Sequence, residues 1–393
     1  MSDDTDKSWQ FWRNRLTSIP ASNSDIWVLL THAPGDNDQS LALADALGAS
    51  SVVKRIDWPL TDPEHDRALV RALLADTADA LQRRNAIGLN GPWPRIVICC
   101  GRRADRVGFW IKRQSGDHTK VVSIGRAHQP VARYDLLAAP PQYALPERAN
   151  IVRLPLPLAR RRQDNAPSRG NAAAGGNMVP VAKPWFTILL GGEVKEFVVS
   201  PQELERTARA AQEAADRHGG SVVVSTSRRT SPEMLAIVEG ALKNPYVYRW
   251  SAANRDENPY EVLLAQSAAL FVTPDSASMM LDCAASGTPT FMVEYPERLN
   301  LRRRLRRDLY RTIRNAIESC RSWGLGRVGR WLGRTQEALH AKGLLRYPRD
   351  LRQLNTSIFD MALAKRIVDF DPARLPVRTQ IANDLSELSG LRQ

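Results

Sequence analysis

Small hydroxyl side chains follow an apolar run in the second half of the chain and could hold a phosphate group. The segment from Ala268 to Val293 reads AALFVTPDSASMMLDCAASGTPTFMV. A strand over its first residues would lead through Asp275 into a helix that begins near Ser276. The first turn of such a helix has unpaired N–H groups and partial positive charge, and Ser276 and Ser278 are small enough to let an anion approach. The same residues could serve only to cap the helix, and the sequence leaves both interpretations open.

Two further loops follow apolar runs and carry residues suited to the same chemistry. Gly191 and Gly192 come after Phe186–Leu190, and glycines permit close contact between backbone and ligand. Arg228 and Arg229 lie in the segment STSRRT after another apolar run, where guanidinium groups and hydroxyls could bind a diphosphate. Ligands of open parallel sheets bind beyond the carboxyl ends of the strands, so three such loops at one edge predict an anion site. Alternatively, the two arginines form an ordinary exposed pair.

These loops are positioned by an alternation of strands and helices that occurs twice, which predicts an α/β fold with parallel sheets. We expect strands over 26–30, 52–56, 96–100, 121–124, 186–190, 221–225, 246–250, 268–273 and 290–293. We expect helices over 39–47, 65–81, 201–217, 232–242, 259–266, 276–286, 356–368 and 377–388. The predicted organisation is an appendage (1–20), a first Rossmann-like domain (21–160), a linker rich in Gly, Ala and Asn (161–184), a second Rossmann-like domain (185–350) and C-terminal helices (351–393).

Composition narrows the class of protein. The 393 residues are 43% hydrophobic and 25% charged, which is ordinary for a folded chain and excludes a wholly disordered one. The four cysteines lack metal-ligand spacing and are expected to be reduced thiols, so we predict no metal site and a cytoplasmic protein. Neither a secretion signal nor a run of about 18 apolar residues is present, so no membrane-spanning helix is predicted.

The net charge of +13 is concentrated in one segment. Between Arg298 and Arg334 there are 12 arginines and two acidic residues. Apolar residues recur there at helical spacing, which predicts a basic amphipathic helix over 298–334 within the second domain. Its apolar positions include Leu305, Leu309, Ile313 and Trp323, and its basic positions include Arg303 and Arg307.

Such a helix is typical of proteins that lie on an anionic membrane, here on the inner, cytoplasmic face. Packing of the apolar stripe on the protein body is one alternative. Nucleic-acid binding is the other, and it is disfavoured because no helix-turn-helix spacing or aromatic-interleaved basic sheet accompanies the charge.

The segments TSRRT, ENPY and VTPDSASMMLDCAASGTP together resemble the second domain of the mitochondrial-fission elongated-mitochondria-type (ELM) family and its bacterial relatives, which are regarded as glycosyltransferases. WVLLTHAPGDNDQSLALADALG and CCGRR resemble that family's first domain. The resemblance implies two Rossmann-like domains facing a central cleft, the GT-B type, with a nucleoside-diphosphate sugar in the second domain and the acceptor at the first. Asp36 stands where relatives usually carry histidine, and Asp282 stands where the wider GT-B pattern has a glutamate that holds the donor ribose.

The function implied is a glycosyltransferase that needs neither a metal nor a cofactor, since a helix terminus with arginines would stabilise the departing diphosphate. We predict donor contacts from Gly191, Gly192, Arg228, Arg229, Ser276, Ser278 and Asp282. His32, Asp36 and Asp38 are the candidates for the acceptor base, unless they only form a turn. A lipid-linked acceptor would suit the membrane-bound position. The alternatives are a nucleotide-sugar epimerase on the same fold and a non-catalytic membrane-associated adaptor.

Overall fold

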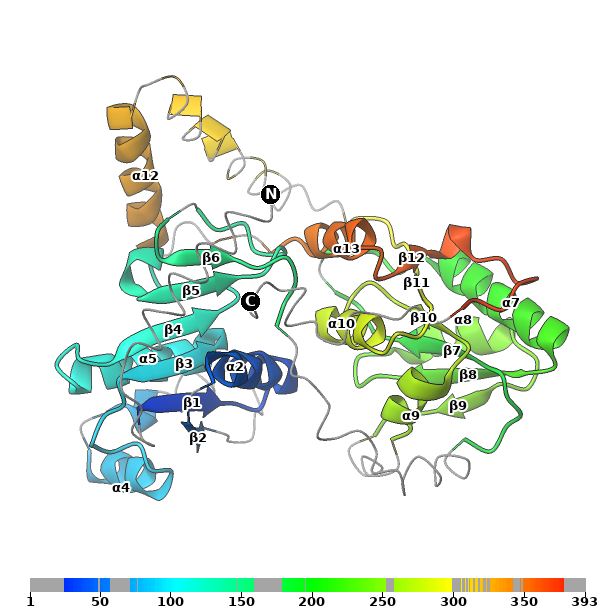
Figure 1. Ribbon diagram of the computed structural model, residues 1–393, viewed down its shortest axis with the longest axis horizontal. Helices are drawn as coiled ribbons and strands as arrows, with labels where there is room; N and C mark the ends of the chain where they lie inside the picture. Colours follow the sequence, from blue (N-terminus) through cyan, green and yellow to red (C-terminus); the bar gives the residue numbers. More distant parts are fainter. Residues whose placement is uncertain are drawn as a thin grey trace. The chain divides into compact units, whose positions relative to one another are not determined.

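The computed structural model describes residues 25–56, 71–158, 179–251, 258–298, 326–341 and 349–377, apart from positions 49, 76, 147 and 195, together with residue 347 and scattered positions between 305 and 323. These residues form two parallel six-stranded sheets with helices packed on them (Figure 1). The predicted α/β class is therefore confirmed.

The first sheet has the strand order β2-β1-β3-β4-β5-β6, and every neighbouring pair is parallel. Its strands are β1 (Ile26–Leu30), β2 (Ser51–Arg55), β3 (Ile96–Cys100), β4 (Lys120–Ile124), β5 (Leu136–Ala139) and β6 (Ile151–Arg153). Its helices are α2 (Pro34–Leu47), α4 (Ala78–Ala86) and α5 (Gly101–Gln114), with a single 3-10 turn, η1 (Val131–Arg133).

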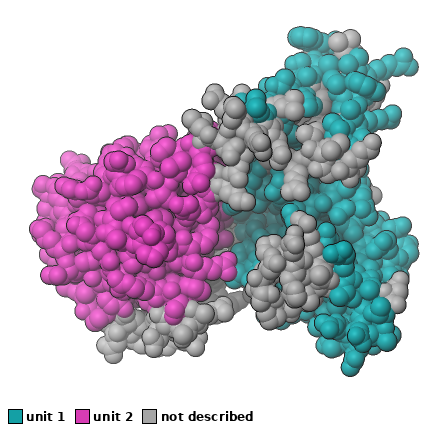
Figure 2. Space-filling model, turned by 180° about the vertical axis from the view of Figure 1, so that it is seen from behind, with its two compact units in different colours: residues 1–160, 300–349, 386–393 teal, residues 161–299, 350–385 magenta. Residues whose placement is uncertain are grey.

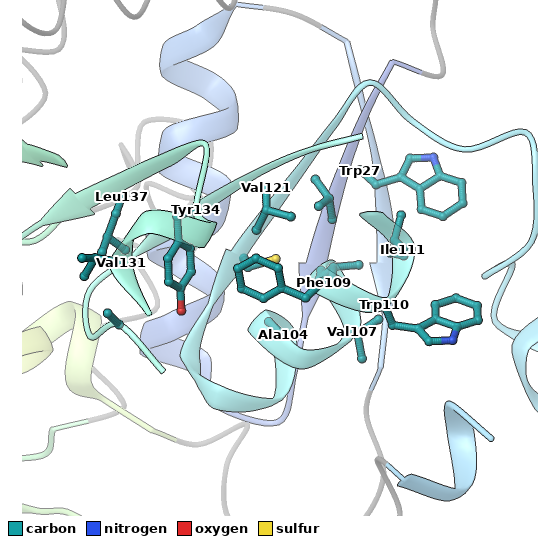
Figure 3. Packing of buried hydrophobic residues seen from close by; sticks show 14 of the residues in the cluster. Trp27, Ala104, Val107, Phe109, Trp110, Ile111, Val121, Val131, Tyr134 and Leu137 are labelled. Carbon is teal, nitrogen blue, oxygen red and sulfur yellow. The ribbon is translucent and has the colours of Figure 1, made fainter. Parts of the chain in front are cut away.

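Alternate residues of the central strands enter two separate hydrophobic clusters, because successive side chains of a strand point to opposite faces. Trp27 and Leu29 of β1 pack with α5 in one cluster (Figure 3). Ile26 and Val28 pack with α2 in the other. Both faces of the sheet are thus covered, which explains why β1 and β3 read as continuous apolar runs rather than as alternating ones.

The second sheet has the order β12-β11-β10-β7-β8-β9 and is also parallel throughout. Its strands are β7 (Trp185–Leu190), β8 (Ser221–Thr226), β9 (Tyr246–Tyr248), β10 (Ala269–Val272), β11 (Thr290–Met292) and β12 (Lys365–Arg366). Its helices are α7 (Pro201–His218), α8 (Pro232–Gly240), α9 (Tyr260–Gln266), α10 (Ala277–Ala285) and α13 (Leu351–Asp360), and η4 (Ile367–Asp369) follows β12. Read from β9, the order is the 3-2-1-4-5-6 of a Rossmann sheet.

The chain divides into two compact units, each built from separated stretches of sequence (Figure 2). Unit 1 comprises residues 1–160, 300–349 and 386–393, and unit 2 comprises residues 161–299 and 350–385. This grouping differs from the predicted domains, which assigned the basic segment to the second domain. The buried Tyr310 explains the difference, because it lies in the unit 1 hydrophobic cluster and donates a hydrogen bond to the Ala144 carbonyl oxygen at 2.6 Å.

The predicted helix over 356–368 is wrong. Helix α13 ends at Asp360, and Ala362 adopts a left-handed conformation with a φ of 55° that interrupts the helix. The chain then adds the short edge strand β12 to the second sheet, beside β11. The predicted helix over 377–388 lies outside the described residues after Val377.

Candidate functional site

The crevice of the second sheet lies between β7 and β10, where the connections leave in opposite directions. Three loops begin at the carboxyl ends of strands in this region: Gly191–Gly192 after β7, Ser227–Thr230 after β8, and Thr273–Ser276 after β10. Ligands of doubly wound sheets bind at such a switch point. If the three loops converge as predicted, their residues should contact one another directly.

Asp275 connects all three loops. Its Oδ2 accepts hydrogen bonds from the Gly192 N–H and from Arg229 Nη2, both at 2.9 Å. Its Oδ1 accepts a hydrogen bond from the Thr273 hydroxyl at 2.6 Å. The Asp275 side chain is fully buried. Burial raises the pKa of Asp275 above its ordinary value, while Thr273, the Gly192 N–H and Arg229 act to lower it. Asp275 thus occupies the crevice as a fixed acceptor.

Gly191 and Gly192 are required by close packing in this crevice. A Cβ on Gly191 would lie 2.0 Å from Asp275 Oδ1, and one on Gly192 would lie 2.0 Å from the Arg229 carbonyl oxygen. The Gly191 N–H donates to the Thr273 hydroxyl at 2.8 Å. Both predicted phosphate-binding N–H groups are therefore engaged by side chains of the loop after β10.

The loop after β8 is held against the loop after β7 by a threonine. Thr230 Oγ1 contacts the carbonyl oxygens of Leu190 and Gly191 at 2.8 and 2.6 Å, and it accepts from the Ser227 N–H at 2.8 Å. This fold of the loop leaves Arg228 exposed, while Arg229 extends to Asp275. The two arginines therefore differ in their contacts with the described residues, since Arg229 pairs with a carboxylate there and Arg228 does not.

Helix α10 begins at this crevice. Ser276 is its N-cap and accepts from the Met279 N–H at 3.4 Å, and Ser278 in the first turn is exposed. Farther along the helix, Asp282 accepts a hydrogen bond from the Tyr260 hydroxyl at 3.1 Å. Ser276 therefore caps the helix, and the interpretation of this helix start as an anion site stays a prediction.

The first sheet has its own switch point, between β1 and β3. Helix α2 begins at Pro34, earlier than predicted, so Asp36 lies in its first turn. Asp36 faces the start of α5, where a Cβ on Gly101 would lie 2.6 Å from Asp36 Oδ2. Gly101 has a φ of 87°, a conformation that glycine adopts readily.

The protonation of Asp36 depends on its neighbours in unit 1. Burial raises the pKa of Asp36, whereas a hydrogen bond from the Cys100 thiol and the charges of His32 and Arg349 lower it. His32 and Asp38, the other predicted base candidates, are exposed. The raised pKa makes Asp36 a stronger base than an ordinary carboxylate.

Residues not predicted from the sequence stabilise this loop. The Asn37 side chain closes it, since Asn37 Oδ1 accepts from the Thr31 N–H at 2.7 Å and Asn37 Nδ2 donates to the Thr31 carbonyl oxygen at 2.6 Å. An amide side chain in the first turn of a helix that follows a strand is a signal that could have indicated this closure. Asn37 is thus a structural residue beside the candidate base.

A second carboxyl group is buried behind this switch point. Asp105 of α5 accepts hydrogen bonds from Ser123 at 2.6 Å and from Tyr134 at 2.7 Å. Burial raises the pKa of Asp105 to about 7, and the charge of Asp36 acts in the same direction. The two carboxyl groups are therefore electrostatically coupled.

Residues 34–323 match the sequence family described as Mitochondrial fission ELM1, which is well over half of the chain. The chain belongs to this family. The family resemblance expected from the sequence is therefore confirmed, and the matched range includes Asp36, Gly101 and the three loops around Asp275 in this ELM1 family member.

The uncharacterized protein RP120 of Rickettsia prowazekii (strain Madrid E) is 23% identical to this ELM1 family member over 319 residues, which are 70% of this chain and 84% of the relative. Among solved structures, the UDP-GlcNAc 2-epimerase from Neisseria meningitidis aligns with a TM-score of 0.43 and 9% identity over 68% of this chain and 82% of its own. MurG of Acinetobacter baumannii aligns with a TM-score of 0.39 and 11% identity over 94% and 92% of the two chains. These likenesses concern the fold alone.

The basic segment is described only in part. The described positions between 305 and 320 are helical, and α12 (Gly326–Ala341) follows. Leu305 and Trp323 are exposed, at 60% and 76%, while Ile313 is half-buried. The predicted membrane residues Leu309, Arg303 and Arg307 lie outside the described residues.

The described residues contain no helix long and apolar enough to cross a membrane. In the same part of the chain, no group of three or more His, Cys, Asp or Glu side chains is arranged to hold a metal ion.

Proposed function

We propose that this ELM1 family member is a metal-independent glycosyltransferase of the GT-B type that binds a nucleoside-diphosphate sugar in unit 2. The observation that carries this proposal is the set of bonds from Asp275 to the Gly192 N–H and to Arg229, which fixes three loops at the switch point of a Rossmann sheet. An anion at this crevice would meet the N-terminus of α10 and the exposed Arg228.

The contacts proposed for the donor depend on which polar groups near the crevice are still available to bind a ligand. Because the N–H groups of Gly191 and Gly192 already donate to Thr273 and Asp275, we assign these glycines to loop packing. The diphosphate would instead contact the first turn of α10, at Ser276 and Ser278, with Arg228 as its counter-charge. Asp282, oriented by Tyr260, would accept from the ribose hydroxyls.

We assign the acceptor base to Asp36. A carboxylate whose pKa is raised by burial accepts a proton more readily than an ordinary one, which suits removal of a proton from a sugar hydroxyl near neutral pH. Asp36→Asn should therefore abolish most transfer, by about 100-fold or more, without changing donor binding. Asp38→Asn, at the neighbouring exposed position, is the matched control and should retain activity.

Calorimetric titration with UDP, GDP, ADP and CDP tests the donor site directly. We expect one of these nucleotides to bind saturably and Arg228→Ala to weaken that binding by about tenfold, which corresponds to the loss of one charge-assisted contact. Arg217→Ala is the control, since Arg217 on α7 pairs with Glu213 at 2.7 Å and lies away from the crevice. Failure of all four nucleotides to bind would overturn the proposal in favour of a non-catalytic adaptor. Product analysis without an acceptor would reveal an epimerase instead.

We also propose that the basic segment docks on an anionic membrane, near a lipid-linked acceptor. Trp331 on α12 is 63% exposed, and Arg327 and Arg334 flank it at helical spacing. Exposed tryptophan between arginines suits the boundary between headgroups and acyl chains.

Sedimentation with vesicles tests this docking. The double variant Trp323→Ser with Trp331→Ser should lose binding to phosphatidylglycerol vesicles and keep its melting temperature, because both rings are exposed. Val198→Ser, an exposed apolar position in unit 2, is the control. Equal binding to neutral and anionic vesicles would contradict the proposal, and preference for RNA would support the nucleic-acid alternative.

A further inference from the structure

Unit 1 contains a cavity that the proposed transferase reaction does not use. Its volume is about 590 Å³, within the range of small-molecule sites. The cavity is lined by Arg71, Leu74, Arg106, Phe109, Trp110, Arg113, Gln129 and Arg133. Four of these eight residues are arginines, and none of the described lining residues is acidic.

Helix α5 provides one wall of this cavity. Gly108 faces the sheet, since a Cβ there would lie 2.6 Å from Cys99 Sγ. Arg106 and Trp110 are each two positions from Gly108, so they lie on the opposite side of the helix. Arg113 follows one turn after Trp110 on the same side. The cavity therefore opens on the face of α5 away from the sheet, whereas Asp36 approaches the first residue of the helix.

The apolar floor of the cavity is rigid. Trp110 packs edge-on against Trp93 at 5.5 Å between ring centroids. Phe109, which Figure 3 shows near Tyr134, packs against the Tyr134 ring at 4.9 Å between centroids. Arg84 lies over the Trp110 ring at 5.1 Å and donates to the carbonyl oxygens of Leu73 and Ala75 at 2.8 and 2.7 Å. These contacts hold the segment that carries Arg71 and Leu74 in place.

One arginine is already oriented for binding. The Arg133 guanidinium lies 4.8 Å from the centre of the Phe109 ring, and its Nη1 donates to Gln129 Oε1 at 2.9 Å. Its Nε and Nη2 donate to none of the residues that the structure describes. A guanidinium fixed on an aromatic face loses little conformational freedom when it binds a ligand, so its remaining donors are preorganised.

Two of the four arginine charges of this cavity are uncompensated by the described residues, unlike those of a comparable hollow in unit 2. The guanidinium groups of Arg106 and Arg113 make no hydrogen bond or ion pair with the residues that the structure describes. In the hollow beside α7, by contrast, Arg209 and Arg217 pair with glutamates one turn away at 2.5 and 2.7 Å. Like charges that converge without counter-charges repel one another, and a bound anion would relieve that repulsion.

We propose that this cavity binds an organic phosphate, with its phosphoryl groups held by Arg106, Arg113 and Arg133 and its apolar part on Leu74 and the edges of the aromatic floor. Several guanidinium groups favour a multiply charged anion over a single carboxylate, and their paired N–H donors match phosphoryl oxygens. The phosphate can belong to a free metabolite or to a lipid headgroup, which share this chemistry.

Calorimetric titration of the full chain with geranyl diphosphate and with pyrophosphate tests the proposal. Geranyl diphosphate should bind at least tenfold more tightly, because it adds apolar contact to the same charge. The double variant Arg106→Gln with Arg113→Gln should weaken its binding at least tenfold while the melting temperature stays equal or rises, since repulsion is removed. The double variant Arg209→Gln with Arg217→Gln is the matched control and should bind as the unaltered chain does.

Vesicles distinguish the two sources of phosphate. If the Arg106 and Arg113 variant loses a preference for phosphatidic acid vesicles over phosphatidylglycerol vesicles, both of which attract the basic segment, the ligand is a lipid headgroup. If that variant loses only the soluble probe, the ligand is a free metabolite. The proposal is overturned if neither probe responds to these two substitutions, or if the α7 control loses as much binding.

Discussion

The two switch points contain the same kind of residue pair arranged in opposite ways. In unit 2 the carboxylate of Asp275 comes from the loop after β10 and lies against Gly191 in the loop after β7. In unit 1 the carboxylate of Asp36 comes from the first turn of α2, which follows β1, and lies against Gly101 after β3. Both carboxylates approach a glycine across the crevice of a parallel sheet, from opposite sides of it.

The partners of these carboxylates differ more than their positions do. Asp275 is fully buried and receives bonds from a backbone N–H, a hydroxyl and a guanidinium, which satisfy it as a structural acceptor. Asp36 is half-buried and has a thiol as its hydrogen-bond partner. Asp275 thus joins the loops of its crevice, whereas Asp36 is the carboxylate suited to exchange a proton. The two occupy corresponding places in the two units.

The largest expected difference between the two switch points is the loss of stability when a glycine is replaced by alanine. Gly192→Ala should destabilise the protein by about 3 kcal/mol or more, because its Cβ would meet a backbone oxygen that cannot rotate away. Gly101→Ala should cost about 1–2 kcal/mol, since its positive φ is strained but the Asp36 carboxylate can move.

Urea unfolding followed by circular dichroism measures both losses. Gly240→Ala at the end of α8 is the control, because its Cβ would meet nothing within 4 Å, and it should leave the unfolding midpoint unchanged within error. Equal losses at Gly192 and Gly101 would break the distinction between a rigid and an adjustable crevice.

The next effect distinguishes the carboxylates themselves. Asp275→Ala should cost about 1–3 kcal/mol by leaving the buried Gly192 N–H without an acceptor, and Asp275→Asn should restore most of this loss because its oxygen can still accept. Asp36→Ala should cost less than about 1 kcal/mol, since its ionised form is disfavoured by burial. Chemical denaturation of the three variants at pH 7 gives the order, and a larger loss at Asp36 would contradict it.

An effect that is smaller for each unit of pH should appear in the pH dependence of the stability of unit 1. The pKa of Asp105 is about 7 in the folded chain and near 3.8 when unfolded, so between these values the folded state binds more protons. Stability should therefore fall as pH rises from about 4 to about 7, by at most about 1.4 kcal/mol per pH unit, and stay level above that range.

Asp105→Asn should flatten this slope, as measured by urea midpoints at pH 5, 6, 7 and 8. Asp79→Asn on the exposed first turn of α4 is the control with one carboxyl group removed. Because the charge of Asp36 raises the pKa of Asp105, Asp36→Asn should shift the sloping range to lower pH. An unshifted range would show that the two groups are not coupled.

Much of the fold could be predicted from local apolar runs. The strands over Ile26–Leu30 and Ile96–Cys100 are found at the predicted residues, because both are continuous five-residue runs buried on two faces. The strand β5, Leu136–Ala139, was missed because leucine and alanine have no strong preference for strands. The strand β12 consists of two exposed basic residues, so its pairing with β11 depends on tertiary structure alone.

The sequence also indicated which loops meet in unit 2, since the carboxyl ends of parallel strands share one edge. It did not indicate that Asp275 would use the glycine N–H group predicted to bind phosphate. That contact joins residues 83 positions apart and is set by the spacing of β7 and β10. The pairing of Asp36 with Cys100 and Gly101 is likewise a product of strand order, because β1 and β3 become neighbours only when β2 is placed at the edge.

Tyr310 and Tyr347 have a consequence for the order in which the protein folds on the ribosome. Both are almost fully buried in the hydrophobic cluster of unit 1, yet they are translated after strands β7 to β11 of unit 2. The first sheet can form early in translation, but its apolar cluster is completed only near the end of synthesis. A nascent or truncated chain that stops at residue 160 therefore lacks two aromatic side chains of its own core and leaves apolar surface for chaperones to cover.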